Sequence, residues 1–400
     1  MADTTVIESL EYYDYKPPLS ENINEAGTTF PIICYNEDIT TLPHKSLLVI
    51  NGKITVKNDK GEPLTSEIDP TKIDFVNNGI LNLFDRIDYY VGDAKIDSIR
   101  KPAISTTLKG YVSFKHNREY HSAGWYNEGK GGFITKEGHF SFTILLSIIM
   151  GFFEDYTQFL YRMAQKLILY KTTANDANCL ISATGYTSPV ITLNEIVWRV
   201  PQVKFSIAYE TQVRKQILSN KNFEMRYRHW LYHTIVCPTA TDFTWDIPVA
   251  YAKTKYILIA FQTDRGNNIK KNNSEFDSVK LENVQVLLNN NVYYPRERLN
   301  LAFDQRKCGN LYHMFKTFKE VYYGGGDTLP LIDYNTFLEK VPIVAIDCSH
   351  QPTVIKESLI NIKVMFNWQT NVAASTVIHC VTIMDRQAVY NPLNNRVVGI

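Results

Sequence analysis

The chain has 400 residues, more than one ordinary hydrophobic core accommodates, so its length predicts two domains of roughly 200 residues each. The formal net charge is +1, from 42 basic and 41 acidic residues, which excludes a global electrostatic field that would hold nucleic acid or an anionic membrane. Aromatic residues form 12% of the chain and long tracts of Ala, Glu and Lys are absent, so the composition favours an all-β fold.

Residues 1–30 are polar and acidic, with Lys16 as their one basic side chain. We predict an extended arm here, because such a segment cannot bury a core of its own, and we expect it to be ordered only against a neighbouring subunit. The segment also lacks the basic and apolar regions of a secretory signal. The sequence therefore predicts a protein made inside a cell.

The rest of the first half alternates in the manner of strands. Residues 47–56 predict a strand, and residues 75–87 predict a short amphipathic helix followed by a hairpin that turns at Gly92. The apolar run 142–153 has 12 residues, fewer than the ~20 that a membrane-spanning helix needs. It predicts buried strands, or a strand and a helical turn, and no membrane span.

A linker is predicted over residues 172–192, which are small, polar and rich in turn formers. The second half predicts a helix that begins near Tyr209 and a second helix over 311–322, ended by the glycines 324–326. A hairpin is predicted over 284–294. Further strands are predicted over residues 196–203, 230–236, 256–261, 362–368 and 377–384.

The hairpin at Val284 has a fainter copy at Ile87, 197 residues earlier. A repeat of half the chain length indicates two similar domains in tandem. Many short strands with few short helices indicate sandwiches or barrels and argue against a βαβ fold.

The side chains that could carry chemistry have simpler interpretations. His229, His233 and Cys237 are spaced by four and resemble metal ligands, but they lie in an apolar strand without a fourth ligand, so we expect core residues. Asp347–His350 could suggest a thiol nucleophile, but neighbours in an extended segment point to opposite faces. Arg265, Lys270 and Lys271 could touch a phosphate, and a solvated loop is the preferred interpretation.

The cysteines stand at least 32 residues apart and form no CxxC pair, so we expect six reduced and mostly buried thiols. The glycines 324–326 follow a helix and precede no Lys-Ser/Thr pair, so they predict a helix end and not a phosphate loop. We predict no catalytic residues, no metal ligands and no cofactor, and therefore no enzyme.

Six segments of the chain resemble a known family, and the most specific of them is Phe276–Gln305, FDSVKLENVQVLLNNNVYYPRERLNLAFDQ. The others are Val76–Ile96, Gly151–Tyr156, Ile196–Val203, Ile257–Asn268 and Val344–Gln351. With these segments the chain resembles the double jelly-roll major capsid proteins of the Polinton and adintovirus type, including endogenous copies in invertebrate genomes. The likeness covers nearly all of residues 190–400 and, more thinly, residues 47–172.

The resemblance implies two tandem eight-stranded antiparallel jelly rolls with a few short helices. It places an N-terminal arm at 1–30, the first jelly roll at 31–190 and the second at 191–400. It implies a structural protein of the virion, whose trimers have pseudo-sixfold symmetry and tile an icosahedral shell around a DNA genome. Penton and minor capsid proteins are the implied partners, contact with packaged DNA is left open, and no catalytic residues are carried over.

Other functions stay open on the sequence alone. A tandem β-sandwich module that binds carbohydrate or a receptor fits the exposed aromatic residues of such loops. A host-domesticated capsid protein would have the same sequence features. An enzyme of the cupin kind would need a convergent set of metal ligands, which the scattered histidines do not supply.

Overall fold

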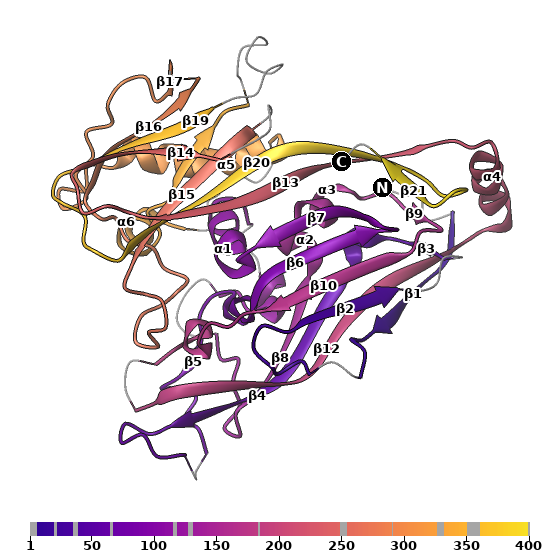
Figure 1. Ribbon diagram of the computed structural model, residues 1–400, viewed down its shortest axis with the longest axis horizontal. Coiled ribbons are helices and arrows are strands. Elements are labelled where there is room, and N and C mark those ends of the chain that lie inside the picture. The colour runs from indigo at the N-terminus through magenta and orange to yellow at the C-terminus, as the bar shows by residue number, and fades with distance from the viewer. Residues whose placement is uncertain are drawn as a thin grey trace.

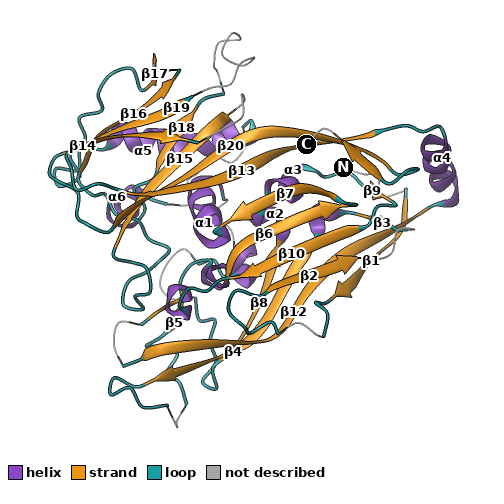
Figure 2. Ribbon diagram, viewed as in Figure 1, coloured by secondary structure: helices purple, strands orange, loops and turns teal. Residues whose placement is uncertain are grey.

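The structure is a computed structural model that describes residues 6–19, 22–34, 39–64, 67–114, 118–126, 131–182, 185–248, 254–289, 291–325, 332–349 and 361–398. Strands are the predominant regular structure of the described chain, and they form two neighbouring sandwiches (Figures 1 and 2). The predicted all-β class is confirmed.

The first sandwich has two facing sheets. The first sheet has the order β1-β12-β4-β8, formed by Ile7–Tyr15, Thr187–Phe205, Leu47–Lys57 and His139–Leu145. The second has the order β2-β10-β6-β7, formed by Thr29–Cys34, Gln165–Lys171, Phe84–Val91 and Ala94–Arg100.

The second sandwich repeats this arrangement. One sheet has the order β13-β20-β15-β18, formed by Phe223–Val236, Thr376–Asn391, Thr254–Thr263 and Val344–Asp347. The other has the order β14-β19-β16-β17, formed by Asp242–Ile247, Ile362–Trp368, Leu281–Leu288 and Asn291–Tyr294. In each half the strands leave one sheet and enter the other in the same sequence, which is the topology of a jelly roll.

The two hairpins noticed in the sequence occupy the same position. β6 and β7 end the second sheet of the first roll, and β16 and β17 end the corresponding sheet of the second roll. The predicted duplication is confirmed by this shared strand order.

Short elements complete the rolls. The helices are η1 (Pro43–Lys45), η2 (Gly79–Leu83), α1 (Pro102–Ser113), η3 (Arg118–Ala123), α2 (Leu146–Ile149), α3 (Gly151–Asp155), η4 (Asp176–Cys179), α4 (Ile207–Leu218), α5 (Gly309–Tyr323) and α6 (Tyr334–Lys340). The remaining strands are β3 (Thr40–Thr41), β5 (Asp74–Phe75), β9 (Leu160–Tyr161), β11 (Leu180–Ile181) and β21 (Arg396–Val398). In the described chain, none of the helices is long and apolar enough to span a bilayer.

Burial explains why these segments form strands. Along β10 and β19 buried and half-buried residues alternate, because one face packs inside a sandwich. β15 is buried on both faces from Tyr256 to Gln262, as its continuous apolar run predicted. The run 142–153 forms the end of β8 followed by α2 and α3, so the prediction of a strand and helical turn is confirmed.

Two predicted helices are confirmed and one is partly wrong. α4 and α5 lie where expected, and α5 ends at Gly324, whose φ of 73° is a left-handed conformation that glycine adopts without strain. The helix expected within 75–87 is shorter: η2 spans Gly79–Leu83, and Phe84 already begins β6. The residues after Leu83 extend because β6 gains hydrogen-bonded partners on both sides, in β10 and β7.

The expectation of an arm ordered only by a neighbouring subunit is wrong for β1. Ile7–Tyr15 pairs antiparallel with β12 of the same chain and takes the position that β13 takes in the second roll. The strand is polar because most of its side chains face solvent, while its backbone groups are satisfied by the sheet.

The predicted linker over 172–192 contains η4, β11 and the start of β12, so it is part of the first roll. The predicted boundary between residues 190 and 191 falls inside β12, which pairs with β4 up to Arg199 and with β1 up to Phe205. The first residues of β12 resemble a linker in sequence, because small and polar residues alternate there with the apolar residues of its buried face.

Side chains cover part of the edge of β12 that β4 leaves open. The backbone N–H of Leu193 donates to Asn24 Oδ1 at 2.7 Å, and Asn24 Nδ2 donates to the Leu193 carbonyl at 2.9 Å. The N–H of Ile191 donates to Asp176 Oδ2 at 2.7 Å. These side chains satisfy backbone groups that a further strand would otherwise occupy.

Candidate functional site at the junction of the two jelly rolls

The two rolls meet where β13 of the second roll lies against β7 and α3 of the first, and where α1 faces α5 (Figure 1). The approach of α3 to β13 is close because Gly151 stands at the start of α3. A Cβ atom built on Gly151 would lie 1.7 Å from the carbonyl oxygen of Arg228, so no larger residue fits there.

A fully buried lysine lies at this junction. The side chain of Lys109, from α1, is 0% exposed, and its Nζ donates to Glu154 of α3. The ammonium also stands over the rings of Trp230 and Tyr322, at 4.8 Å and 5.0 Å from the ring centroids. Burial lowers the pKa of Lys109, and the Glu154 charge opposes this shift. The ion pair and the aromatic rings replace the hydration that the ammonium loses.

Glu154 connects three elements. Its Oε2 accepts from the Tyr322 hydroxyl at 2.8 Å and its Oε1 accepts from the Tyr323 hydroxyl at 2.8 Å, in addition to Lys109. The carboxylate therefore joins α3 and α1 of the first roll to the last turn of α5 in the second. Burial raises the pKa of Tyr322, so its hydroxyl stays protonated and donates.

A second ion pair lies beside the first. Asp155 accepts from Arg228 Nε at 2.8 Å and from Arg228 Nη2 at 2.5 Å, a bidentate arrangement. Arg228 Nη1 donates to the Tyr322 carbonyl at 2.6 Å, and its guanidinium lies 3.6 Å from the Tyr322 ring centroid. The pair thus fixes β13 against α3 and α5 at once.

Further along β13, His229 Nδ1 lies 2.6 Å from Asp97 Oδ1 of β7, and both side chains are almost fully buried. Asp97 Oδ2 also accepts from the backbone N–H of Phe152 at 2.9 Å. The Tyr227 hydroxyl donates to the Ile96 carbonyl at 2.5 Å. Alternate residues of β13 therefore bind the edge strand of the first roll.

This arrangement holds two domains together. Each of its charged groups has an oppositely charged or hydrogen-bonding partner, and the set mixes ion pairs with aromatic contacts at one interface. Breaking a buried pair by removing one member is strongly destabilising, so the network fixes one relative placement of the rolls.

A family model described as the double jelly roll-like domain matches residues 73–388. The chain belongs to this double jelly roll-like family. No curated protein matches the sequence.

Solved structures agree on the fold of this double jelly-roll chain. A chain of the Sputnik virophage is similar over 100% of this chain and 90% of its own length, with 12% identity and a TM-score of 0.63. The mavirus major capsid protein is similar over 97% of this chain and 90% of its own length, with 10% identity and a TM-score of 0.55. The Faustovirus major capsid protein is similar over 97% of this chain and 91% of its own length, with 8% identity and a TM-score of 0.53. At these identities the likeness concerns the fold alone.

The metal-like residues of the double jelly-roll chain do not converge. His229 is bound to Asp97, His233 Nε2 lies 3.2 Å from the Thr382 hydroxyl, and the Cys237 thiol contacts the Pro238 carbonyl. Across the described ranges, no group of three or more His, Cys, Asp or Glu side chains is placed to hold a metal ion.

The other candidates have structural partners. Arg265 donates to Asp277 at 2.5 Å and to the Asn272 carbonyl at 2.7 Å, so it ties its own loop. Lys271 donates to the Thr263 carbonyl, and Lys270 is exposed. Cys348 is buried at the end of β18, and His350 lies outside the described residues. All six cysteines lie within the described residues as buried side chains outside any disulfide, so their predicted burial is confirmed.

The junction residues were missed by sequence reasoning. Lys109 is a lone cation in the otherwise uncharged helix sequence PAISTTLKGYVS, and this was the available sign that it needed a buried partner. Glu154 and Asp155 directly follow an apolar run, but nothing in the sequence showed that they meet residues 109, 228 and 322.

Proposed function

We propose that the chain is a structural major capsid protein of the Polinton and adintovirus type, which tiles an icosahedral shell of a virion around a DNA genome. The observation that carries the proposal is the duplication: two rolls of identical strand order, fixed together by buried ion pairs. A shell needs many similar surfaces in fixed relative positions, and each chain supplies two of them.

The arrangement within the chain supports a trimer. β7 of the first roll is covered by β13 of the second. β17 has the position of β7 in its own roll, and β1 has the position of β13. The exposed side chains Val292 and Tyr294 of β17, and Tyr12 and Tyr13 of β1, are 40–46% exposed. We infer that β17 of one copy faces β1 of the next, which closes a ring of three chains and six similar rolls.

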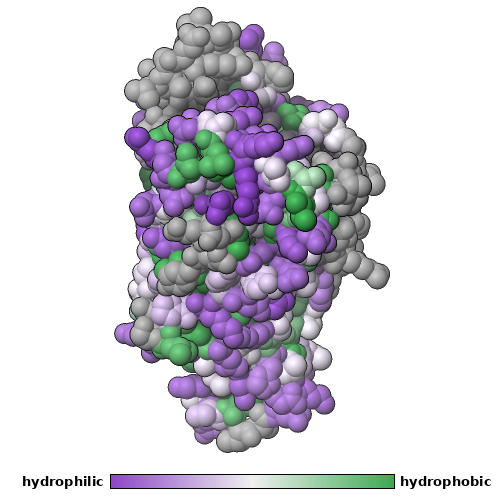
Figure 3. Space-filling model, turned by 90° about the vertical axis from the view of Figure 1, so that its right-hand side faces the viewer, coloured by the Kyte–Doolittle hydropathy of each residue, from purple (hydrophilic) through white to green (hydrophobic). Residues whose placement is uncertain are grey.

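Domain limits follow from the same pairing. We propose that the first roll includes β1 and extends to Phe205, and that α4 joins it to the second roll, which begins with β13. The far end of the molecule, where α4 lies, has a mostly hydrophilic face with small separate apolar patches (Figure 3). Ile207 and Leu218 of α4 are exposed large apolar residues.

Light scattering on the purified chain tests the proposal. A trimer gives about 138 kDa, three times 46.0 kDa, and assembled shells give far larger particles that negative-stain microscopy resolves. A protein that stays at 46.0 kDa at high concentration, and forms no particle in any salt or pH, would contradict the shell role and favour a tandem binding module.

Penton and minor capsid proteins complete the proposed shell, since trimers with pseudo-sixfold symmetry cannot occupy fivefold vertices. A host-domesticated copy would assemble in the same way, and its genomic neighbourhood would distinguish it. Co-expression with candidate penton proteins should convert open sheets or partial shells into closed particles.

A further inference from the structure

A groove of about 680 Å³ opens between the two rolls, separate from the buried junction. The first roll lines it with the ends of β6, β7 and β10, and the second roll lines it with β13 and β14. A volume of this size is within the ~300–1,000 Å³ typical of small-ligand sites. Both domains therefore contribute to one concave surface.

Cationic side chains predominate in this groove. One carboxylate lines it, Asp85, against four basic side chains: Arg86, Arg100, Lys101 and Lys171. Asp85 Oδ1 is already bound by Lys101 Nζ at 2.5 Å and by the Thr172 hydroxyl at 2.9 Å. The electrostatic potential in the groove is therefore positive, because the other basic side chains that line it outnumber its carboxylates.

The two arginines that line the groove, Arg86 and Arg100, are direct neighbours. Arg86 of β6 and Arg100 of β7 are paired residues in the antiparallel register, so their side chains leave the same face of the sheet. Arg86 lies 3.3 Å from Asp88 and 3.8 Å above the Tyr170 ring. Arg100 is exposed and forms no ion pair or side-chain hydrogen bond with the described part of the chain. Like charges placed directly opposite destabilise a strand pair unless an anion joins them.

The opposite wall is aromatic and polar. Tyr232, His233 and Trp245 come from the second roll. Burial and, to a smaller extent, the positive charge of Arg100 together lower the pKa of His233 to about 4. The imidazole is therefore neutral at physiological pH and adds no competing charge.

We propose that this groove binds a polyvalent oxyanion, a ligand that carries two or more phosphate or sulfate groups. Arg100 supplies an unpaired fork of donors, and guanidinium groups match the geometry of tetrahedral oxyanions. Arg86 and Lys101 lie beside it to contact a second group, and the Tyr232 and Thr234 hydroxyls lie across the groove. A ligand held there would bridge the two rolls. The inference does not depend on the shell role.

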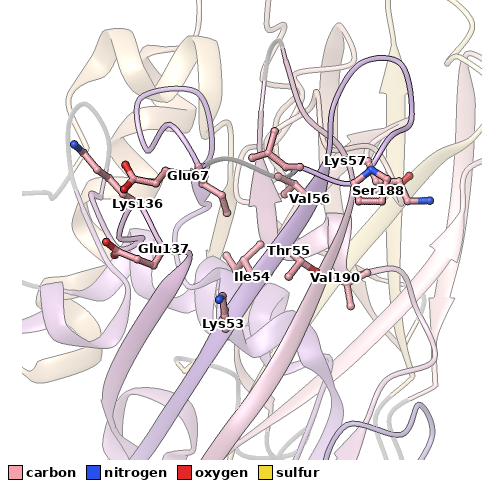
Figure 4. Close-up of a pocket in the computed structure, with 13 residues that line it drawn as sticks. Lys53, Ile54, Thr55, Val56, Lys57, Glu67, Lys136, Glu137, Ser188 and Val190 are labelled. Carbon is pink, nitrogen blue, oxygen red and sulfur yellow. The ribbon is translucent and has the colours of Figure 1, made fainter.

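Another groove of the chain provides the matched control. Lys53, Lys57 and Lys136 line a cavity of about 430 Å³ near the far ends of β4 and β12, together with Glu67 and Glu137 (Figure 4). Its basic side chains are accompanied by carboxylates and belong to the first roll alone. Three lysines against two carboxylates leave a charge of +1 in the control groove, whereas four basic side chains against one carboxylate leave +3 in the proposed site. The control therefore distinguishes a built site from general attraction to basic side chains.

Calorimetric titration of the full chain with tripolyphosphate, and separately with a multiply sulfated disaccharide, tests the proposal at constant ionic strength. We expect one site per chain and a rise in the thermal midpoint on binding, because the ligand binds only the folded chain. R100A should weaken the affinity about tenfold and R100E should abolish binding, since a lost charged hydrogen bond has an effect of this size. R100K should fall between R100A and the native chain.

K53A, in the control groove, should change the affinity less than about twofold. Preference for one probe over the other identifies phosphate or sulfate as the source. Equal weakening by K53A and R100A, or binding no tighter than that of chloride, would overturn the proposal. Circular dichroism of R100A distinguishes a lost ligand contact from a lost fold, and R100K repeats the test in a variant that keeps the charge.

Discussion

β7 and β17 occupy the same position in their rolls and have opposite environments. β7 buries Ile96, Asp97 and Ile99, and β13 of the other roll lies against it. β17 has no buried residue, and Val292 and Tyr294 stand in solvent. Because the fold is duplicated, the difference shows which edge the chain covers by itself and which it leaves open, and the open edge is the one that we propose for contact with a neighbouring copy.

The two surfaces also differ in chemistry. The covered surface, where β13 lies against β7, is held by the ion pairs Lys109–Glu154 and Arg228–Asp155, which stabilise a buried interface only when each charge keeps its partner. The open surface on β17 presents Val292 and tyrosine side chains without buried charge. Ion pairs suit a contact formed once during folding, while apolar and aromatic groups suit an interface that forms between finished subunits.

The largest effect is expected from Glu154→Ala, which leaves Lys109 charged, buried and without its carboxylate. The free energy of unfolding should fall by about 3–5 kcal/mol in urea denaturation. The double variant K109M/E154Q removes both charges and should recover most of this loss. If E154A costs no more than K109M/E154Q, the ion pair does not hold the covered surface.

Acid should lower the stability of the folded chain through two buried histidines of the second roll, His379 and His233. Burial lowers the pKa of His379 to about 3 and that of His233 to about 4. The unfolded chain protonates both near pH 6.5, whereas the folded chain resists until pH reaches about 4, so stability is complete above 6.5 and falls with pH below it. Each histidine accounts for about 1.6 kcal/mol between pH 6.5 and 5, so we expect a loss of about 3 kcal/mol. H379Q should remove about half of this dependence, and an unchanged profile would contradict the assignment.

Tyr227→Phe tests one hydrogen bond between β13 and β7. It removes the hydroxyl that donates to the Ile96 carbonyl at 2.5 Å and keeps the ring against Phe152. We expect a loss of about 1 kcal/mol in urea denaturation. Tyr12→Phe, on the exposed strand β1, is the control and should change stability by less than about 0.3 kcal/mol.

The smallest effect on stability is expected at the open surface. V292E together with Y294E should change the unfolding free energy of the monomer by less than about 0.5 kcal/mol, because both side chains are exposed. The same variant should lose the trimer in light scattering. V398E is the matched control, because Val398 is 44% exposed like Val292 and lies on β21. A trimer that survives V292E/Y294E would place the contact between copies elsewhere.

Most strands could be predicted because their burial leaves a pattern. β15 and β19 show it as a continuous run and as alternation, and α5 shows an apolar stripe with a glycine end. β1 could not be recognised, because its side chains are mostly exposed and only its backbone is bound. The extent of β12 was missed for a related reason. Its first residues are of types that are common in turns, and they form a strand because they pair with β4.

The junction was beyond sequence reasoning. The pairs join residues 45 and 73 positions apart, and the tyrosines that complete the Glu154 site come from α5, more than 160 residues away. Local patterns carry no record of such contacts. The solitary Lys109 indicated that a partner was needed but not which one.

The hydrogen bonds that Asn24 and Asp176 form with β12 limit aggregation of the protein. At high concentration a chain meets its own copies, and an open strand edge would let them join without limit, as in a fibril. By occupying the backbone groups of Ile191 and Leu193, these side chains end the hydrogen-bond ladder along the first half of β12, before its pairing with β1 begins. A strand of another copy therefore cannot add to this part of the edge.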